Sequence, residues 1–143
     1  MVQVGLLEDN ARIANLCATM LQHLGHEVIV YKYARDCLQA LAPLDTAQQQ
    51  GAKAQGTAFP FHLPVQVLIL DLHLPDIDGV EVLKRLRAHP FTKSLPLIFC
   101  TAATAEEIAK ALRIAPDAVL IEKPFKLATL TSAISNALDA ASN

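Results

Sequence analysis

The sequence predicts an α/β fold in which a parallel sheet is covered by helices on both faces. Five short apolar runs recur along the chain, and segments with helical periodicity separate them. The runs are almost continuously apolar instead of alternating between apolar and polar residues. Strands show this pattern when crossover helices bury both faces of the sheet. The order of the elements therefore favours β–α pairs over a bundle or a sandwich.

The five expected strands are short and rich in Val, Ile and Leu. The third is nearly all apolar, which suits a central strand with no solvent-exposed face. The strands are expected at Val2–Leu7, Val28–Tyr33, Val65–Leu70, Leu95–Cys100 and Ala118–Ile121.

The expected helices are recognised by apolar residues on one face. In the first helix these residues follow the spacing i, i+3, i+4, i+7, i+8 and i+11, and Gly25 is placed to end the helix. They are Ile13, Leu16, Cys17, Met20, Leu21 and Leu24. The other helices are expected at Ala34–Ala42, Val80–His89, Ala105–Ile114 and Leu127 to about Ala140.

Composition excludes several classes of protein. The 143 residues fit a single domain, 1–143, and 52% of them are hydrophobic, so the chain is not expected to be disordered. Apolar runs stop after about four residues, too few to span a membrane, and Glu8 and Asp9 interrupt any signal peptide. The net charge of −2 argues against nucleic-acid binding. We expect a cytoplasmic protein whose cysteines, Cys17, Cys37 and Cys100, are reduced and buried.

One segment, 43–64, departs from the regular alternation of strands and helices. It runs from Pro43 to Pro64 and contains Gln48–Gln50, two glycines and several alanines. A connection of this length without clear structure is uncommon in a compact domain. It is expected to be a surface loop or, in part, an extension of the preceding helix up to Gln50. A functional role is a third possibility.

Polar residues with complementary chemistry follow the expected strands. Parallel α/β sheets bind ligands beyond the carboxyl ends of their strands, where this chain places Glu8, Asp9, Asp71, Thr101 and Lys123. Carboxylates gathered at one edge need a cation, and Mg²⁺ prefers oxygen ligands. A lysine and a hydroxyl suit a phosphoryl group, and a carboxylate such as Asp71 can accept one.

Each of these residues alone has a simpler interpretation. Glu8 and Asp9 could belong to a helix N-terminus, Thr101 could cap the helix that begins near Ala105, and Lys123 could be an ordinary surface lysine. The functional interpretation is favoured because all of these groups fall at the ends of strands on one edge of the sheet.

The chain resembles the receiver domain of two-component response regulators. The resemblance rests on Asp71–Gly79 (DLHLPDIDG), on Glu8-Asp9 upstream, and on Cys100–Ala102 and Glu122–Phe125 downstream, and it covers Val2 to about Ala140. It implies a flavodoxin-like (βα)5 fold with strand order 2-1-3-4-5.

The resemblance also implies roles for individual residues. Asp71 would be the phosphoacceptor, with Lys123 and Thr101 contacting the phosphoryl group. Mg²⁺ would bind to Asp9, to Asp71 and to the backbone carbonyl of His73, while Glu8 would act through water. The implied partners are a sensor histidine kinase or histidine phosphotransfer protein and an unknown downstream protein, which would bind through the face formed by residues 101–125.

Two features depart from the family, and two other functions stay open. Leu120 stands where the family often has Tyr or Phe, and 43–64 is longer than usual. Because no output domain follows, the chain is expected to be a stand-alone or an excised receiver. It is not expected to be an enzyme beyond self-catalysed phosphoryl transfer and autodephosphorylation. The alternatives are an interaction module that is never phosphorylated and a phosphatase with an aspartate nucleophile. The phosphatase would need a carboxylate two residues after Asp71, where this chain has His73.

Overall fold

The computed structural model describes residues 2–43, 63–123 and 125–142. Their strands form one parallel sheet in the order β2-β1-β3-β4-β5, which confirms the fold class and strand order predicted above. The strands are β1 (Gln3–Leu7), β2 (Glu27–Tyr31), β3 (Val67–Leu70), β4 (Leu97–Thr101) and β5 (Val119–Glu122). The helices are α1 (Ala11–His23), α2 (Ala34–Leu41), α4 (Gly79–Ala88), α5 (Ala105–Ile114) and α6 (Leu127–Ser142).

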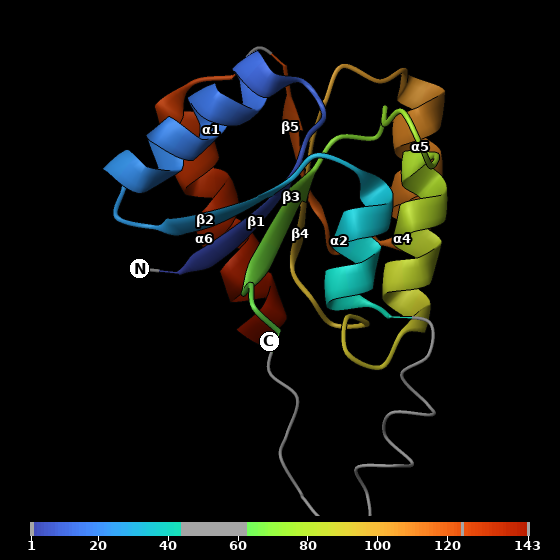
Figure 1. The fold of residues 1–143 in the computed structure, drawn as a ribbon. Helices are drawn as coiled ribbons and strands as arrows, with labels where there is room; N and C mark the ends of the chain where they lie inside the picture. The colour runs from blue at the N-terminus through green and yellow to red at the C-terminus, as the bar shows by residue number, and fades with distance from the viewer. Residues whose placement is uncertain (1, 44–62, 124, 143) are drawn as a thin grey trace, which may run out of the picture.

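The helices form a layer on each face of the sheet (Figure 1). One core cluster joins the sheet to α2, α4 and α5, and it includes Leu38, Leu83 and Ala111. The other joins the sheet to α1 and α6, and it includes Cys17 and Ile134. Every residue of β3 is fully buried, as expected for the central strand. The acceptor candidate Asp71 therefore follows a strand that is held on both faces and both edges.

The sheet is less covered at its β2 edge. In this outer strand Ile29 and Val30 are exposed. Leu16, which the periodicity placed on the inward face of α1, is 54% exposed, so that assignment was wrong. Ala14 is buried in its place, because the buried face of α1 runs through Ala14, Cys17 and Leu21.

Most predicted element boundaries are correct to within two residues. The α5 prediction is confirmed in full, and Gly25 after α1 has φ +92°, a conformation that favours glycine. Each strand prediction needs a correction of one or two residues at one end or both. The largest are that β2 ends at Tyr31, that β3 begins at Val67 and that β4 begins at Leu97. Of the segment 43–64, residues 44–62 lie outside the described part, so the structure does not test the alternatives for it.

The loop between β3 and α4 is fixed at both ends by close backbone contacts. Asp78 is the N-cap of α4, where its carboxylate accepts a hydrogen bond from Val80 N–H. Gly79 N–H donates to the Leu72 carbonyl oxygen, and a Cβ on Gly79 would lie 2.5 Å from that oxygen. Only glycine permits this approach, which brings the start of α4 against the residue that follows Asp71.

The same loop caps a second helix. Tyr33, the N-cap residue of α2, provides no side-chain hydrogen bond. The carboxylate of Asp76, 42 residues from Ala34 in sequence, caps the helix instead. It accepts hydrogen bonds from Ala34 N–H at 3.1 Å and from Arg35 N–H at 3.0 Å. Burial alone would raise the pKa of Asp76, but these backbone hydrogen bonds outweigh it and hold the pKa below its usual value.

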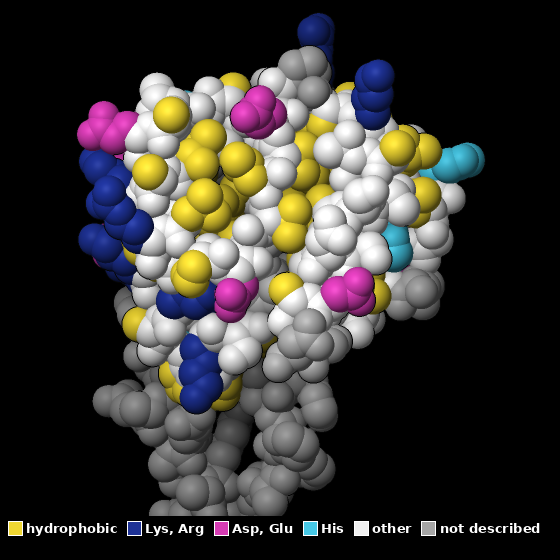
Figure 2. All heavy atoms as spheres, turned by 180° about the vertical axis from the view of Figure 1, so that it is seen from behind, with side chains coloured by type: hydrophobic (Ala, Val, Ile, Leu, Met, Phe, Trp, Pro, Cys, Tyr) yellow, Lys and Arg dark blue, Asp and Glu magenta, His cyan; other side chains and the backbone are white. Residues whose placement is uncertain are grey.

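The surface carries its charges unevenly. Figure 2 shows Lys and Arg side chains gathered along the edge of the molecule where α4 and α5 lie. The exposed basic residues of these helices are Lys84, Arg85, Lys110 and Arg113. Among the described helices, none is both long and apolar enough to cross a lipid bilayer.

The cap formed by Asp76 leads to a prediction on stability. Asp76→Ala removes both hydrogen bonds to the start of α2, so we expect the free energy of unfolding at neutral pH to fall by about 1 kcal/mol. Because the pKa of Asp76 is depressed by folding, its contribution is present above the unfolded pKa and is lost as pH falls through the folded pKa. Urea unfolding of both proteins at pH 7 and at about pH 3 tests this. Equal stability at pH 7 would show that the cap contributes nothing.

Candidate phosphorylation site

The carboxyl ends of four neighbouring strands bring together four of the predicted side chains. Glu8 follows β1, Asp71 follows β3, Thr101 is the last residue of β4, and Lys123 follows β5. Glu8, Asp71 and Thr101 are buried although they are polar, with exposed fractions of 4%, 8% and 1%. Since buried polar groups need partners, the contacts among these side chains determine whether the arrangement is stable.

The ammonium of Lys123 lies between two buried carboxylates. Its Nζ is 2.7 Å from Glu8 Oε1 and 2.8 Å from Asp71 Oδ2. Burial raises the pKa of Glu8, although the hydrogen bond from Lys123 opposes this. Burial would lower the pKa of Lys123, but its hydrogen bonds to Asp71 and Glu8 outweigh this effect and raise it. Lys123 therefore stays charged at neutral pH and offsets the negative charge of the site.

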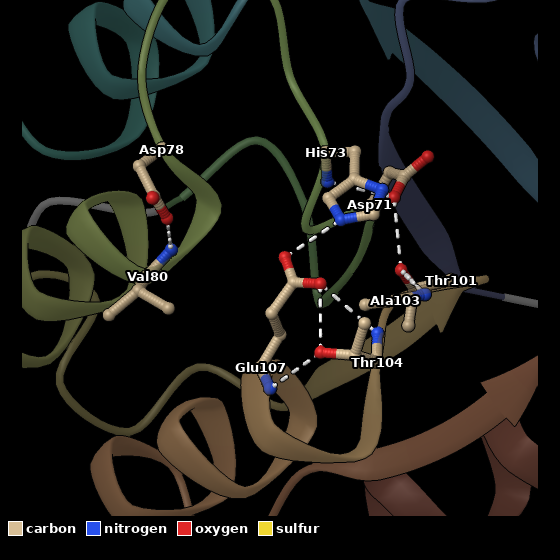
Figure 3. A network of polar contacts seen from close by, with 8 residues as sticks. All are labelled: Asp71, His73, Asp78, Val80, Thr101, Ala103, Thr104 and Glu107. Atoms are coloured by element: carbon tan, nitrogen blue, oxygen red, sulfur yellow. Dashed lines mark hydrogen bonds and ion pairs between the residues drawn. The ribbon is translucent and has the colours of Figure 1, made fainter.

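The other oxygen of Asp71 accepts two hydrogen bonds. Thr101 Oγ1 donates to Asp71 Oδ1 at 3.2 Å, and His73 N–H donates to the same oxygen at 3.0 Å (Figure 3). Thr101 Oγ1 in turn accepts from Ala103 N–H at 3.1 Å. The carboxylate is thus held by a cation on one oxygen and by a hydroxyl and an amide on the other, in a fixed orientation.

Asp9 is also a predicted site residue, but its side chain does not take part in the contacts among Glu8, Asp71, Thr101 and Lys123. It follows Glu8 at the same edge and is half-buried, but it forms no hydrogen bond or ion pair with another described residue. The simpler interpretation of this segment as a helix cap is wrong for Asp9, because Asn10 caps α1 by accepting from Ile13 N–H. Glu8 accepts from Asn10 N–H and so contributes to this turn.

Asp9 and Asp71 offer carboxylate oxygens, which are the type of ligand that Mg²⁺ prefers. No group of three or more His, Cys, Asp or Glu side chains in the described part of the chain is arranged to hold a metal ion. Mg²⁺ does not need such a group, because it is usually held by one or two carboxylates and keeps several water ligands. Asp9 and Asp71 follow the paired strands β1 and β3 and supply oxygen ligands of this kind.

Sequence reasoning missed a contact that joins His73 to α5. His73 Nε2 is 2.8 Å from Glu107 Oε2, and Glu107 also forms a capping box with Thr104, the N-cap of α5 (Figure 3). The pattern Thr-x-x-Glu at residues 104–107 is a known signal for a helix start, so the cap could have been predicted. It also corrects the alternative in which Thr101 caps α5. Nothing in the pattern indicated that Glu107 would also meet His73.

The position of Lys123 leads to a second prediction. Lys123→Met leaves Glu8 and Asp71 buried without the ammonium, so the free energy of unfolding at pH 7 should fall by about 3 kcal/mol. Folding already raises the pKa of Glu8, and losing Lys123 raises it further. The folded variant then binds a proton more tightly than the unfolded chain, so the deficit should shrink as pH is lowered to about 5.

Urea unfolding at the two pH values checks this expectation. Lys126→Met, at an exposed position nearby, is the matched control for the loss of one positive charge. A deficit of the same size at both pH values, or one shared by the control, would contradict the assigned role of Lys123.

Comparison with known proteins identifies the family to which this arrangement belongs. The family model described as "Response regulator receiver domain" matches residues 4–135. The transcriptional regulatory protein CreB of Escherichia coli is 36% identical over 104 residues, which is 72% of this chain and 36% of that protein. Ethylene receptor 2 of Arabidopsis thaliana is 32% identical over 106 residues, which is 74% of this chain but 12% of the receptor.

Solved structures show the same fold. The chemotaxis protein CheY4 of Vibrio cholerae matches with a TM-score of 0.71 and 25% identity, covering 96% of this chain and 99% of that one. The receiver domain of the Francisella response regulator 1452 matches with a TM-score of 0.70 and 19% identity, covering 97% and 98% of the two chains. Since the family model covers most of the chain, the protein belongs to the response regulator receiver domain family of two-component signalling.

Proposed function

We propose that Asp71 is the phosphoacceptor of a signalling switch and takes its phosphoryl group from a phosphohistidine of a sensor histidine kinase or a histidine phosphotransfer protein. Membership of the receiver family supports phosphorylation-controlled signalling, a role in which such domains are generally not enzymes. The observation that carries the choice of residue is the set of contacts on Asp71, whose two oxygens are held by Lys123 and by Thr101 and His73.

The proposed transfer uses Asp71 as the nucleophile. One carboxylate oxygen forms a bond to phosphorus while the P–N bond of the phosphohistidine breaks, and the imidazole nitrogen leaves with the electron pair of that bond and takes up a proton. Lys123 lies 2.8 Å from Asp71 Oδ2, close enough to contact the oxygens of the transferred group. Thr101 lies against Oδ1, where its hydroxyl can donate to a phosphoryl oxygen.

Mg²⁺ belongs to this proposal because receiver domains typically bind it at the phosphorylation site. We assign Asp9, Asp71 and the backbone carbonyl of His73 as its ligands, with Glu8 acting through water. When bound, the ion would neutralise phosphoryl oxygens in the transition state. Lys123 is the cation that contacts both Glu8 and Asp71 within the protein itself.

The output is proposed to be a change in the face formed by residues 101–125, which binds a downstream protein in the cytoplasm. This face begins at Thr101, includes all of α5, and ends beyond Lys123. Both of those residues contact Asp71, so added charge on Asp71 acts directly on the two ends of the face. The chain spans 12% to 36% of the length of the curated relatives Ethylene receptor 2, LuxO and CreB, so the role of any larger protein is outside this proposal.

The third prediction tests the acceptor. With Mg²⁺ and a small phosphodonor such as acetyl phosphate, the protein should gain the mass of one phosphoryl group, and chelating the metal should suppress the gain. Asp71→Asn preserves shape but removes the nucleophile, so it should not be labelled. Asp117→Asn, at an exposed aspartate beside the opposite end of β5, is the matched control and should be labelled like the parent. Intact-mass measurement decides, and undiminished labelling of Asp71→Asn would refute the assignment.

The fourth prediction distinguishes a residue that transmits the effect of phosphorylation from one that only stabilises the core. Thr101→Ala removes the hydroxyl on Asp71 Oδ1, so phosphorylation should persist while its effect on the amide resonances of α5 is lost. Leu120 pairs in register with Phe99 and packs half-buried against the α2–α4–α5 core. Leu120→Ala should therefore cost about 2 kcal/mol of stability and keep the resonance changes. Loss of those changes in a folded, phosphorylated Leu120→Ala protein would make Leu120 a switch residue and contradict this assignment.

A further inference from the structure

A second route of contacts joins Asp71 to the first turn of α5 without passing through Thr101. It begins at Asp71 Oδ1, which accepts from His73 N–H, and continues from the His73 ring to Glu107 (Figure 3). Together with the route through Thr101 and Ala103, it closes a ring of contacts around the β3–α4 and β4–α5 loops. The two loops are therefore tied together at two separate places.

The carboxylate of Glu107 is shared between the two loops. Its Oε1 accepts from Thr104 N–H at 3.1 Å and from Thr104 Oγ1 at 3.0 Å. Its Oε2 is free of these bonds and lies 2.8 Å from His73 Nε2. Because the capping box fixes the carboxylate on α5, the His73 ring is anchored to a helix and not to another mobile side chain.

We propose that Glu107 is a positioning residue for the phosphorylation site, which holds His73 and the loop after Asp71 in place and thereby couples α5 to Asp71 independently of Thr101. This inference rests on the proposed function. The contact requires both His73 and Glu107. Through this contact, any change at Asp71 that alters its hydrogen bond with the His73 amide would also affect α5.

The link has consequences for the acyl phosphate. In hydrolysis water attacks phosphorus, the P–O bond to Asp71 breaks, and inorganic phosphate leaves the regenerated carboxylate. Asp71 is buried, and His73 N–H donates to its Oδ1, so the backbone of the loop that carries His73 lies against the carboxylate. Freeing this loop should admit water more readily and shorten the lifetime of the phosphorylated state.

The test is a double-mutant cycle with His73→Ala, Glu107→Ala and the double variant. His73→Ala removes the ring but keeps the backbone amide and carbonyl. Two controls isolate the link. Glu106→Ala removes the same charge from an exposed position in the same helical turn. Thr104→Ala removes the hydroxyl that caps α5 but keeps the backbone N–H of residue 104, which still donates to Glu107 Oε1 and leaves Oε2 available to His73. The lifetime of the acyl phosphate is measured by intact mass after removal of the phosphodonor.

Each single variant should shorten the lifetime by about two- to fivefold, the range that one exposed side-chain hydrogen bond allows, and the double variant should add nothing further. Glu106→Ala should match the parent, and Thr104→Ala should lower stability more than it shortens the lifetime. Independent single effects that multiply in the double variant, or a Thr104→Ala effect equal to that of Glu107→Ala, would overturn the proposal.

A second readout does not depend on phosphoryl transfer. Titration with Mg²⁺ should shift the amide resonances of residues 104–107 in the parent and in Glu106→Ala, and the shifts should shrink by half or more in His73→Ala. Shifts of equal size in His73→Ala would contradict the inference, and so would their absence in the parent. If the parent shows these shifts but is never labelled on Asp71, then the proposed function fails while the link between the loops stands.

Discussion

The placement of one ammonium between two buried carboxylates is the constraint on which this site depends. Glu8 and Asp71 are both buried at the carboxyl edge of the sheet, where two uncompensated negative charges would oppose folding. Lys123 Nζ lies within 2.8 Å of both, so the fold can tolerate them. Under the function proposed above, a phosphoryl group on Asp71 would compete with Glu8 for the same ammonium, so a site balanced in this way would respond to the added charge.

The loop that follows the acceptor is attached to three helices. Asp76 caps α2, Gly79 contacts the Leu72 backbone at the start of α4, and His73 meets Glu107 on α5. Each attachment uses a different kind of interaction: a charge at a helix N-terminus, a close backbone approach, and a side-chain pair. These attachments connect the loop after Asp71 to helices that are far apart in sequence but share one helical layer.

The sequence was sufficient to predict the fold and the convergence of four polar side chains on one edge of the sheet. Apolar runs and helical spacing are local signals, and the strand-end rule converts them into a spatial arrangement, so Glu8, Asp71, Thr101 and Lys123 were placed together before any contact was known. The errors came from non-local effects. Leu16 satisfied the helical spacing but faces solvent, because the position of α1 on the sheet decides which side of the stripe is buried.

The distant contacts of Asp76 and Glu107 were missed by the sequence analysis for the same reason. Asp76 and Glu107 each bond to partners that lie more than 30 residues away in sequence, and neither carries a signal of that distant contact. Their local patterns, an acidic loop and a capping box, are compatible with purely local roles. The contact of Lys123 with both Glu8 and Asp71 was not predicted either, because it depends on side-chain reach and not on sequence spacing.

A crystal structure of the protein with Mg²⁺ and beryllofluoride, a mimic of the phosphoryl group, tests the central claim most directly. The account predicts the beryllium bonded to a carboxylate oxygen of Asp71, with Lys123 Nζ and Thr101 Oγ1 directed at its fluorines. It also predicts that Lys123 moves away from Glu8 to meet the added charge. Beryllofluoride bound at another residue, or bound at Asp71 with Lys123 still paired to Glu8 and not to the fluorines, would contradict it.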